Sequence, residues 1–187
     1  MNTNIFSQFP VLETERLFLG RIEPVHLKDF YEIFSSENVM VLYGMYALTE
    51  YKDAAWFIQR FNESFAARRS IRWGMYLKSN GKLIGTCGYH GFSEMSSRAE
   101  MGYELNEVFW RQGYMDEALK AIITWGFSVF DLNRIEVLIY PENQASEGIA
   151  LKNHFKFEGL LRQYAYFRDI YQDLNMFSLL RQEWSDV

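Results

Sequence analysis

Hydrophobic residues recur along this chain with two different periods, and the changes from one period to the other predict a succession of strands and helices. Apolar and polar positions that alternate, with many β-branched and aromatic side chains, predict strands. Apolar residues three or four positions apart predict amphipathic helices. We expect strands at 16–22, 72–78, 82–90, 99–105, 134–140, 157–168 and 174–181, and helices at 25–35, 52–68, 113–130 and 143–155.

The helix at 52–68 and the turn after the strand at 72–78 give the plainest of these signals. Five apolar side chains share one face of that helix, namely Ala54, Phe57, Ile58, Phe61 and Phe65. The sequence Ser79-Asn80-Gly81 is typical of a tight hairpin turn between two strands. The order of the elements predicts an α+β fold, layered α/β/α around one mixed sheet.

Composition and charge favour one compact domain that does not bind nucleic acid. The chain has 187 residues, 49% of them apolar, which is enough for a substantial core. It contains no linker, low-complexity tract or fixed-period repeat, so we expect a single domain over 1–187. Aromatic residues make up 18% of the chain, but a formal charge of −5 opposes their use as a stacking surface for bases. We therefore assign them to the core and to strand faces.

Cysteine and histidine usage argues against a disulfide or a metal site. Cys87 is the single cysteine, and its apolar neighbours predict a buried side chain rather than a nucleophile. The histidines, His26, His90 and His154, do not combine with it in a metal-binding spacing, so we expect no metal. The first residues do not form a signal peptide, and no segment is long and apolar enough to span a membrane. We expect a cytoplasmic protein with no membrane partner.

The most informative segment is 109–119, which reads FWRQGYMDEAL and joins a strand to a helix. A glycine turn that opens a helix leaves several backbone N–H groups unpaired, with the positive end of the helix dipole behind them. Such a turn can bind a phosphate group. A single glycine between a strand and a helix is also ordinary turn chemistry, so the segment alone leaves both interpretations open.

The segments that follow make the pattern specific. After that helix come a strand, then Asn143-x-x-Ser146, then a helix that ends near Phe155. This order resembles the GCN5-related N-acetyltransferase (GNAT) superfamily, and most closely its branch of ribosomal-protein alanine N-acetyltransferases, which also includes enzymes for small amines. Three further segments resemble the opening, central and closing strands of that branch, namely 14–19, 99–105 and 178–184.

The resemblance implies a fold and a cosubstrate. The fold is a mixed, largely antiparallel sheet of six to seven strands with about four flanking helices, in which the strands at 99–106 and 134–140 splay apart. The cosubstrate is acetyl-CoA, with its pyrophosphate on the backbone around Gly113 and its pantetheine arm beside the first of these strands. The residues expected to bind it are Leu105, Glu107, Arg111, Gln112, Gly113, Tyr114, Met115, Asp116 and Asn143.

Some of these positions depart from the usual GNAT pattern. Trp110, Arg111 and Met115 replace the residues most common around the glycine, although Met115 still supplies its backbone N–H. Asp116 would repel a diphosphate if it faced it, so we expect its side chain to point outward or to cap the helix. Arg111 either adds a charged contact or is simply solvated, and Asn143 either bonds the CoA arm or forms an Asx turn.

The resemblance also suggests catalytic residues, each with a structural alternative. Glu100 matches a glutamate that recurs in this branch and would accept the proton of the amine, or it is a partner for an arginine or a loop. Ser146 matches the branch's candidate proton donor, or it is the N-cap of its helix, or both. Many GNAT members place a tyrosine where this chain has Ala150, which leaves the donor role to Ser146 or water. His90 is a weaker candidate base.

The leading interpretation is an acetyl-CoA-dependent N-acetyltransferase that acts on a primary amine, either a protein N-terminus or a small amine. The alternative is an acyl-CoA-binding sensor or assembly module without turnover. The acceptor would be selected by the loops at 40–50 and 164–172, which carry no readable motif. Members of this branch are often dimers, so a homodimer is possible by resemblance.

At His154 the family usually has glycine, so this residue must adopt the cap conformation or the helix must end differently.

Overall fold

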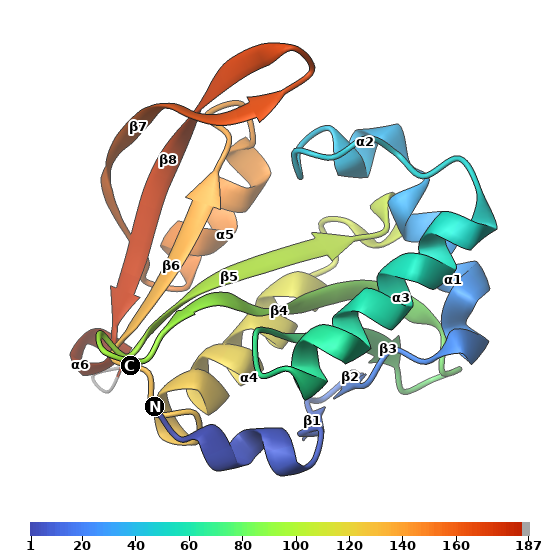
Figure 1. Ribbon diagram of the computed structural model, residues 1–187, viewed down its shortest axis with the longest axis horizontal. Coiled ribbons are helices and arrows are strands. Elements are labelled where there is room, and N and C mark those ends of the chain that lie inside the picture. The colour runs from blue at the N-terminus through green and yellow to red at the C-terminus, as the bar shows by residue number, and fades with distance from the viewer. Residues whose placement is uncertain (185–187) are drawn as a thin grey trace.

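The computed structural model describes residues 1–184, which form one sheet covered by helices on both faces (Figure 1). The strand order is β1-β2-β3-β4-β5-β6-β8-β7, and every pair is antiparallel except β5–β6. The strands are β1 (Leu12–Glu13), β2 (Leu17–Gly20), β3 (Ile71–Leu77), β4 (Leu83–Ser93), β5 (Arg98–Leu105), β6 (Arg134–Ile139), β7 (Lys156–Phe167) and β8 (Ile170–Leu180). The mixed, largely antiparallel α+β fold is confirmed, and its sheet has eight strands in the described residues where six to seven were expected.

Four helices of two turns or more flank the sheet in the described part of the chain, as predicted. They are α1 (Leu27–Phe34), α3 (Tyr51–Ala66), α4 (Tyr114–Ser128) and α5 (Gln144–Lys152). Single turns add α2 (Glu37–Met40) and α6 (Arg181–Trp184), and 3-10 turns occur at Thr3–Ser7, Pro24–His26 and Glu107–Phe109. These short elements, like the two-residue β1, have too few residues to show a hydrophobic period, and the sequence analysis did not predict them.

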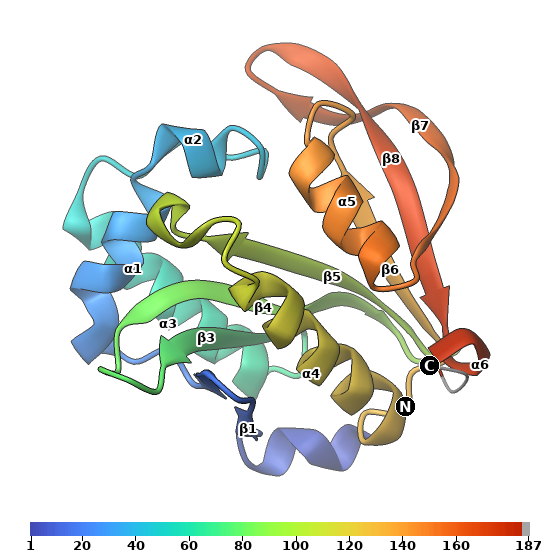
Figure 2. The same cartoon turned by 180° about the vertical axis from the view of Figure 1, so that it is seen from behind.

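The helices divide the core into two layers. Helices α1 and α3 cover one face of β2–β5, and α4 covers the other (Figures 1 and 2). Between α4 and the sheet lies the larger cluster, which includes Trp73, Leu119 and Ile123. A smaller cluster under α1 and α3 includes Phe30 and Ile58. Strand β3 and the first seven residues of β4 are buried because both of their faces are covered.

The two parallel neighbours, β5 and β6, separate after a short contact. Residues 98–100 pair with 134–136, and the pairing ends there although β5 continues to Leu105 and β6 to Ile139. Beyond Glu100 the strands diverge into an open fork, with β6, β8, β7 and α5 on one arm (Figure 1). The predicted splay is therefore present. It exposes the backbone edges of two central strands in the middle of the molecule.

The C-terminal strands form a long hairpin rather than two strands joined by a loop. Only Arg168 and Asp169 separate β7 from β8, and both have positive φ (54° and 62°). A two-residue hairpin turn requires this backbone conformation, but these positions contain no glycine or asparagine, so the sequence does not predict the turn. The prediction of a loop at 164–172 is therefore wrong, because most of these residues belong to the two strands of the hairpin. The closing strand ends at Leu180, and the residues to Trp184 are helical, so the predicted end of this strand was too late.

Candidate active site

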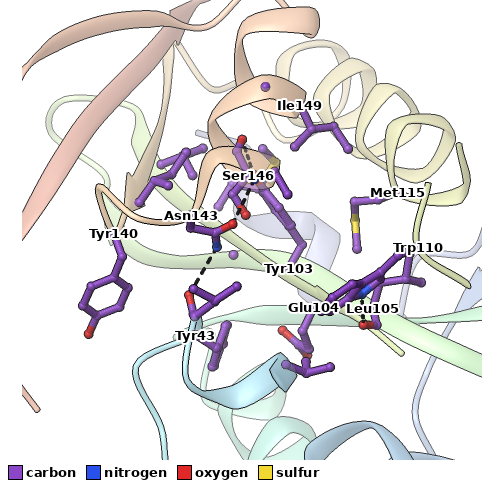
Figure 3. Close-up of a pocket in the computed structure, with 18 of the residues that line it drawn as sticks. Tyr43, Tyr103, Glu104, Leu105, Trp110, Met115, Tyr140, Asn143, Ser146 and Ile149 are labelled. Carbon is purple, nitrogen blue, oxygen red and sulfur yellow. Dashed lines mark hydrogen bonds between the residues drawn. The ribbon is translucent and has the colours of Figure 1, made fainter. Parts of the chain in front are cut away.

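A cleft of about 1100 Å³ occupies the fork between β5 and β6. At one end lies the turn that precedes α4, which we call the turn end (residues 109–116). At the other lies a face of β5 that carries Glu100 and Glu104, which we call the carboxylate end. The start of α5 and the loop after α2 border the space between them (Figure 3).

Backbone conformation defines the turn end. Arg111 and Gly113 both have positive φ (59° and 81°), and α4 begins directly after them. Helical bonding starts where the N–H of Glu117 donates to the carbonyl of Gly113 at 3.1 Å, so the N–H groups just before it have no partner within the helix. A Cβ on Gly113 would lie 3.3 Å from Nη2 of Arg16. Glycine therefore fits this position both for its φ and for the nearby guanidinium.

Arg16, at the edge of β2, holds this turn from behind. Its Nε lies 2.6 Å from the Glu117 carboxylate and its Nη1 donates to the carbonyl of Gln112 at 2.9 Å. Its guanidinium also lies 4.3 Å from the ring centroid of Tyr114. Thr14 donates a further hydrogen bond to Glu117. Burial alone would raise the pKa of Glu117, but these hydrogen bonds outweigh it and lower that pKa.

The side chain of Asp116 is held against α5 by two residues near the end of that helix. Lys152 Nζ lies 2.9 Å from one carboxylate oxygen, and Asn153 Nδ2 donates to the other at 3.0 Å. Partial burial opposes ionisation, but these bonds and the nearby Lys120 lower the pKa of Asp116. The positive charges of Lys120 and Lys152 offset the negative charge of Asp116 at the turn end.

The other residues expected to bind the cosubstrate divide into two groups. Those that line the cleft are Leu105, Arg111, Tyr114, Met115 and Asn143, together with Gly113 and Asp116. Glu107 and Gln112 lie outside the lining. Glu107 accepts hydrogen bonds from Ser36 and Asn38, and the side chain of Gln112 donates to the carbonyl of Val108.

Asn143 and Ser146 lie close together at the start of α5 (Figure 3). The N-cap is Asn143, whose Oδ1 accepts from the N–H of Ser146 at 3.1 Å, and its Nδ2 donates to the carbonyl of Leu42 at 3.4 Å. Ser146 is therefore not the N-cap, which removes one alternative for it. Tyr103 of β5 donates to the carbonyl of Ser146 at 3.3 Å. The side chain of Ser146 also interacts with Tyr103 through a hydrogen bond, which opposes the rise that burial causes in the pKa of Tyr103.

Glu100 and Glu136 lie side by side at the base of the fork, since they pair across β5 and β6. Glu136 is paired with two arginines, Arg98 at 2.6 Å and Arg134 at 2.7 Å. The basic side chain in contact with Glu100 is that of His90, whose Nε2 lies 3.5 Å from Oε1. Burial, and then Glu136, raise the pKa of Glu100, while His90 and Arg98 oppose the rise. Of the two carboxylates, Glu100 is the one that lines the cleft.

Glu104 is a buried acid of the cleft that the sequence analysis missed. It forms an ion pair with Arg72 of β3 and accepts a hydrogen bond from Thr86 of β4. Burial raises the pKa of Glu104 against the attraction of Arg72. Arg72 also donates to the hydroxyl of Tyr43 at 3.3 Å, which joins the loop after α2 to the sheet. The period of two along β5 was the available signal, because it places Glu100 and Glu104 on one face.

Gly102 lies between these two acids and keeps the space above β5 open. A Cβ at this position would lie 3.1 Å from Arg72 Nη1, and 3.9 Å from both His90 Cε1 and the Tyr43 hydroxyl. Side chains of two strands and one loop thus converge on a point that carries no side chain of its own. The carboxylate end is a small polar space bounded by acids on two sides.

Several other predictions concern residues outside the cleft. Cys87 is fully buried, and burial raises the pKa of its thiol to about 12, as expected of a structural side chain. His154 has a φ of 65°, so it adopts the left-handed cap conformation after α5. Within residues 1–184 we find no cluster of three potential metal ligands. None of the helices in the same part of the chain has the length and hydropathy needed to cross a membrane.

Sequence comparisons identify the family. A family model described as an acetyltransferase (GNAT) domain matches residues 16–156. The chain is 35% identical to the uncharacterized N-acetyltransferase YoaA of Bacillus subtilis (strain 168), over 92% of this chain and 98% of that protein. It is 24% identical to the ribosomal-protein-serine acetyltransferase of Escherichia coli (strain K12), over 88% of this chain and 93% of that protein.

Among solved structures, the fold resembles that of RimL, a ribosomal L7/L12 alpha-N-protein acetyltransferase crystallised in complex with coenzyme A. The TM-score is 0.82 at 20% identity, and the alignment covers 93% of this chain and 99% of that one. At this identity the likeness concerns the fold. The family model and the similarity to YoaA reach further, and they show that this chain is an acyltransferase that belongs to the GNAT family of acetyltransferases.

Proposed function

We propose that this protein is an acetyl-CoA-dependent N-acetyltransferase that acts on a primary amine, either a protein N-terminus or a small amine. The observation that carries the proposal is the cleft itself, which joins an unpaired helix N-terminus to a carboxylate with few cationic partners. The first feature suits the phosphates of a CoA molecule, and the second suits proton transfer from an amine. The acetyl group would come from the thioester of acetyl-CoA.

The turn end would bind the diphosphate. Its free N–H groups and the positive end of the α4 dipole favour an anion, and the absent side chain of Gly113 allows close approach. Asp116 is already bonded to Lys152 and Asn153, so it does not oppose the phosphates directly. Arg111 lies on the cleft lining and adds a charged donor. The pantetheine arm would follow the open edge of β5 near Leu105.

Glu100 would act as the general base. An ammonium ion has no lone pair, so the amine must lose one proton before its nitrogen can bond the acetyl carbon. The raised pKa of Glu100 brings this carboxylate closer to the working range of a base at neutral pH. Glu104, in contrast, is committed to Arg72 and Thr86 and would shape the space around the amine.

Ser146 would supply the second proton. When the C–N bond forms and the C–S bond breaks, the departing sulfur needs a proton and the nitrogen of the new amide must lose one. The hydroxyl of Ser146, in the cleft lining, would give its proton to the sulfur and recover one from that nitrogen. Tyr103 and Asn143 position its backbone through the two bonds at its carbonyl and N–H. Ala150 on α5 is 1% exposed, and its methyl group has no proton to donate. The donor role therefore falls to Ser146 or to water.

The acceptor class follows from charge and from relatives. Glu100 and Glu104 lie on either side of Gly102 on one face of β5, but Glu104 is paired with Arg72, so Glu100 is the carboxylate that remains to attract an ammonium group. The similarity to a ribosomal-protein-serine acetyltransferase supports a protein N-terminus as one acceptor.

The test is amine-dependent release of free thiol from acetyl-CoA, measured with a colorimetric thiol reagent. The acceptor panel contains polyamines, amino sugars and peptides with free N-termini, and N-acetylated versions of the same peptides are the matched negative controls. Calorimetry with acetyl-CoA alone runs in parallel. We expect binding, and release with at least one amine class. Binding without release for every amine would favour the sensor, and no binding would contradict the proposed role of the turn end.

A further inference from the structure

We propose that His90 is a positioning residue whose imidazolium forms an ion pair with the Glu100 carboxylate, and that this ion pair keeps Glu100 ionised and able to accept a proton from the amine. The inference rests on the proposed function, because it concerns the same base. It assigns a task to a residue that the sequence marked only as a weak candidate base. It also explains why Glu100 and Glu136, although adjacent, have different partners.

The imidazole contacts Glu100 at both ring nitrogens. His90 and Glu100 are register partners on the antiparallel strands β4 and β5. Nδ1 lies 2.9 Å from the backbone carbonyl oxygen of Glu100, and Nε2 lies 3.5 Å from its carboxylate Oε1. One side chain therefore meets the main chain and the side chain of the same residue.

These two contacts restrict the position of the protons. A carbonyl oxygen only accepts, so Nδ1 must carry a hydrogen. In a neutral ring Nε2 then has only a lone pair, and an ionised carboxylate also offers only lone pairs. Nε2 and Oε1 attract each other only when a proton lies between them. The pair thus has its favourable geometry when it holds one proton in addition to that on Nδ1.

The other charged groups around His90 and Glu100 are paired with one another. From β6, Glu136 faces Glu100 but is neutralised by Arg98 and Arg134. On the other side, Arg72 and Glu104 are paired with each other, and the uncharged Tyr43 hydroxyl accepts from Arg72. The ring edge of His90 lies 3.9 Å from the Cβ position above Gly102, so it borders the space assigned to the amine.

The proton balance of the step is simple. The ammonium of the acceptor gives one proton to Glu100 and becomes a neutral amine, and the carboxylate becomes a carboxylic acid. His90 keeps its protons throughout and acts through Glu100. A positive imidazolium next to the carboxylate holds Glu100 ionised to lower pH than burial and Glu136 would allow. Loss of His90 must therefore move the acid limb of the reaction to higher pH.

The decisive variant is His90→Asn. The asparagine amide can still donate to the Glu100 carbonyl in place of Nδ1, but it is too short to reach the carboxylate, so it separates the contact with the main chain from the ion pair. His154→Asn is the matched control, because His154 lies outside the cleft and asparagine tolerates its positive φ. His90→Gln is the second variant, since its amide reaches farther but carries no charge.

Two measurements test the idea. The first is the pH profile of kcat/KM, in which we expect His90→Asn and His90→Gln to move the acid limb upward by about one pH unit, the effect of one lost neighbouring charge. His154→Asn should leave the limb in place. The second is carbon-13 NMR titration of the Glu100 carboxyl carbon, assigned by its loss in Glu100→Gln. Its midpoint should move upward in His90→Asn by a similar amount.

The outcomes separate the two proposals. If the wild type transfers acetyl to no amine, the proposed function fails, and the NMR titration still decides the inference because it needs no substrate. If the wild-type and His90→Asn titrations of Glu100 coincide, the proposed ion pair is wrong even when the enzyme is active. A uniform loss of kcat/KM at all pH values, with an unmoved limb, also overturns it and makes His90 structural.

Discussion

The two ends of the cleft are built in different ways. The turn end is nearly continuous in sequence, since residues 109–116 supply its backbone, and Arg16 and α5 only support it. The carboxylate end is assembled from three strands and a loop, through Arg72, His90, Glu100, Glu104 and Tyr43. The acids also differ, because hydrogen bonds lower the pKa of Glu117 at the first end and burial raises that of Glu100 at the second.

The difference indicates a division of tasks. A site made from backbone N–H groups binds an anion that varies little, and it tolerates changes of side chain provided that the turn is kept. A site made from side chains on several strands can tune one pKa through its neighbours. We therefore expect substitutions at the turn end to affect binding and local stability, and substitutions at the carboxylate end to affect turnover and core stability.

The largest effect should come from Glu100→Gln. Removal of a general base typically costs about 10²–10⁴-fold in rate, and we expect kcat/KM to fall in this range. The affinity for acetyl-CoA should stay within about twofold, because the carboxylate end does not contact the diphosphate site. Steady-state kinetics and calorimetry measure the two quantities. Glu136→Gln is the matched control, and it should reduce thermal stability more than turnover. Equal losses of turnover in both variants would contradict the assignment.

Next in size is the stability cost of Arg72→Met. This change leaves Glu104 buried without its cation, and loss of one partner of a buried pair costs about 3–5 kcal/mol in the free energy of unfolding. Urea denaturation measures it. Arg60→Met removes an exposed pair with Glu63 and should cost less than about 1 kcal/mol. A similar small cost for both variants would mean that Glu104 is solvated in the protein.

At the turn end, Glu117→Gln should lower stability in a pH-dependent way. The pKa of Glu117 is lowered in the folded protein, so its carboxylate stabilises the fold above the ordinary glutamate pKa, and this contribution disappears as pH falls through the lowered value. We expect about 2 kcal/mol between wild type and variant at pH 7, from the charged hydrogen bonds to Thr14 and Arg16. The difference should shrink steadily in urea denaturation below about pH 4. A difference in stability that stays constant over this pH range would contradict this explanation.

The smallest effect is expected for Gly113→Ala. A methyl group at a φ of 81° and close to Arg16 costs about 1 kcal/mol and pushes the turn away from a bound anion. We expect a Kd for acetyl-CoA raised by about tenfold in calorimetry, which corresponds to about 1.4 kcal/mol. Gly81→Ala is the control, because its φ of 74° gives the same strain with no atom within 4 Å. Weakened binding in the control as well would remove the link to the turn.

The sequence predicted those parts of the molecule that depend on local patterns. The hydrophobic periods placed the main strands and helices, and the glycine turn at 113 was visible as a break between a strand and a helix. It missed the tight hairpin at Arg168 and Asp169, where positive φ occurs without the residues that usually announce it. It also gave Ser146 an N-cap role that belongs to Asn143.

The carboxylate end was only half visible in the sequence. Glu100 was named through resemblance, but its neighbours are separated from it by up to 57 positions, from Tyr43 to Glu100, and no local pattern links them. Glu104 and Gly102 were accessible in principle through the period of two along β5. Their contacts could not be predicted, because Arg72 and Thr86 reach this part of β5 from other strands.

The sequence by itself determined the order of elements, the family resemblance and the backbone turn at Gly113, since each depends on residues close together in the chain. Only the tertiary structure decided which of two adjacent acids faces the cleft. Glu100 and Glu136 are both strand glutamates, but strand pairing gives one of them two arginines and the other a histidine. A pKa depends on the charges and the solvent around a group, and these are set by contacts between distant segments.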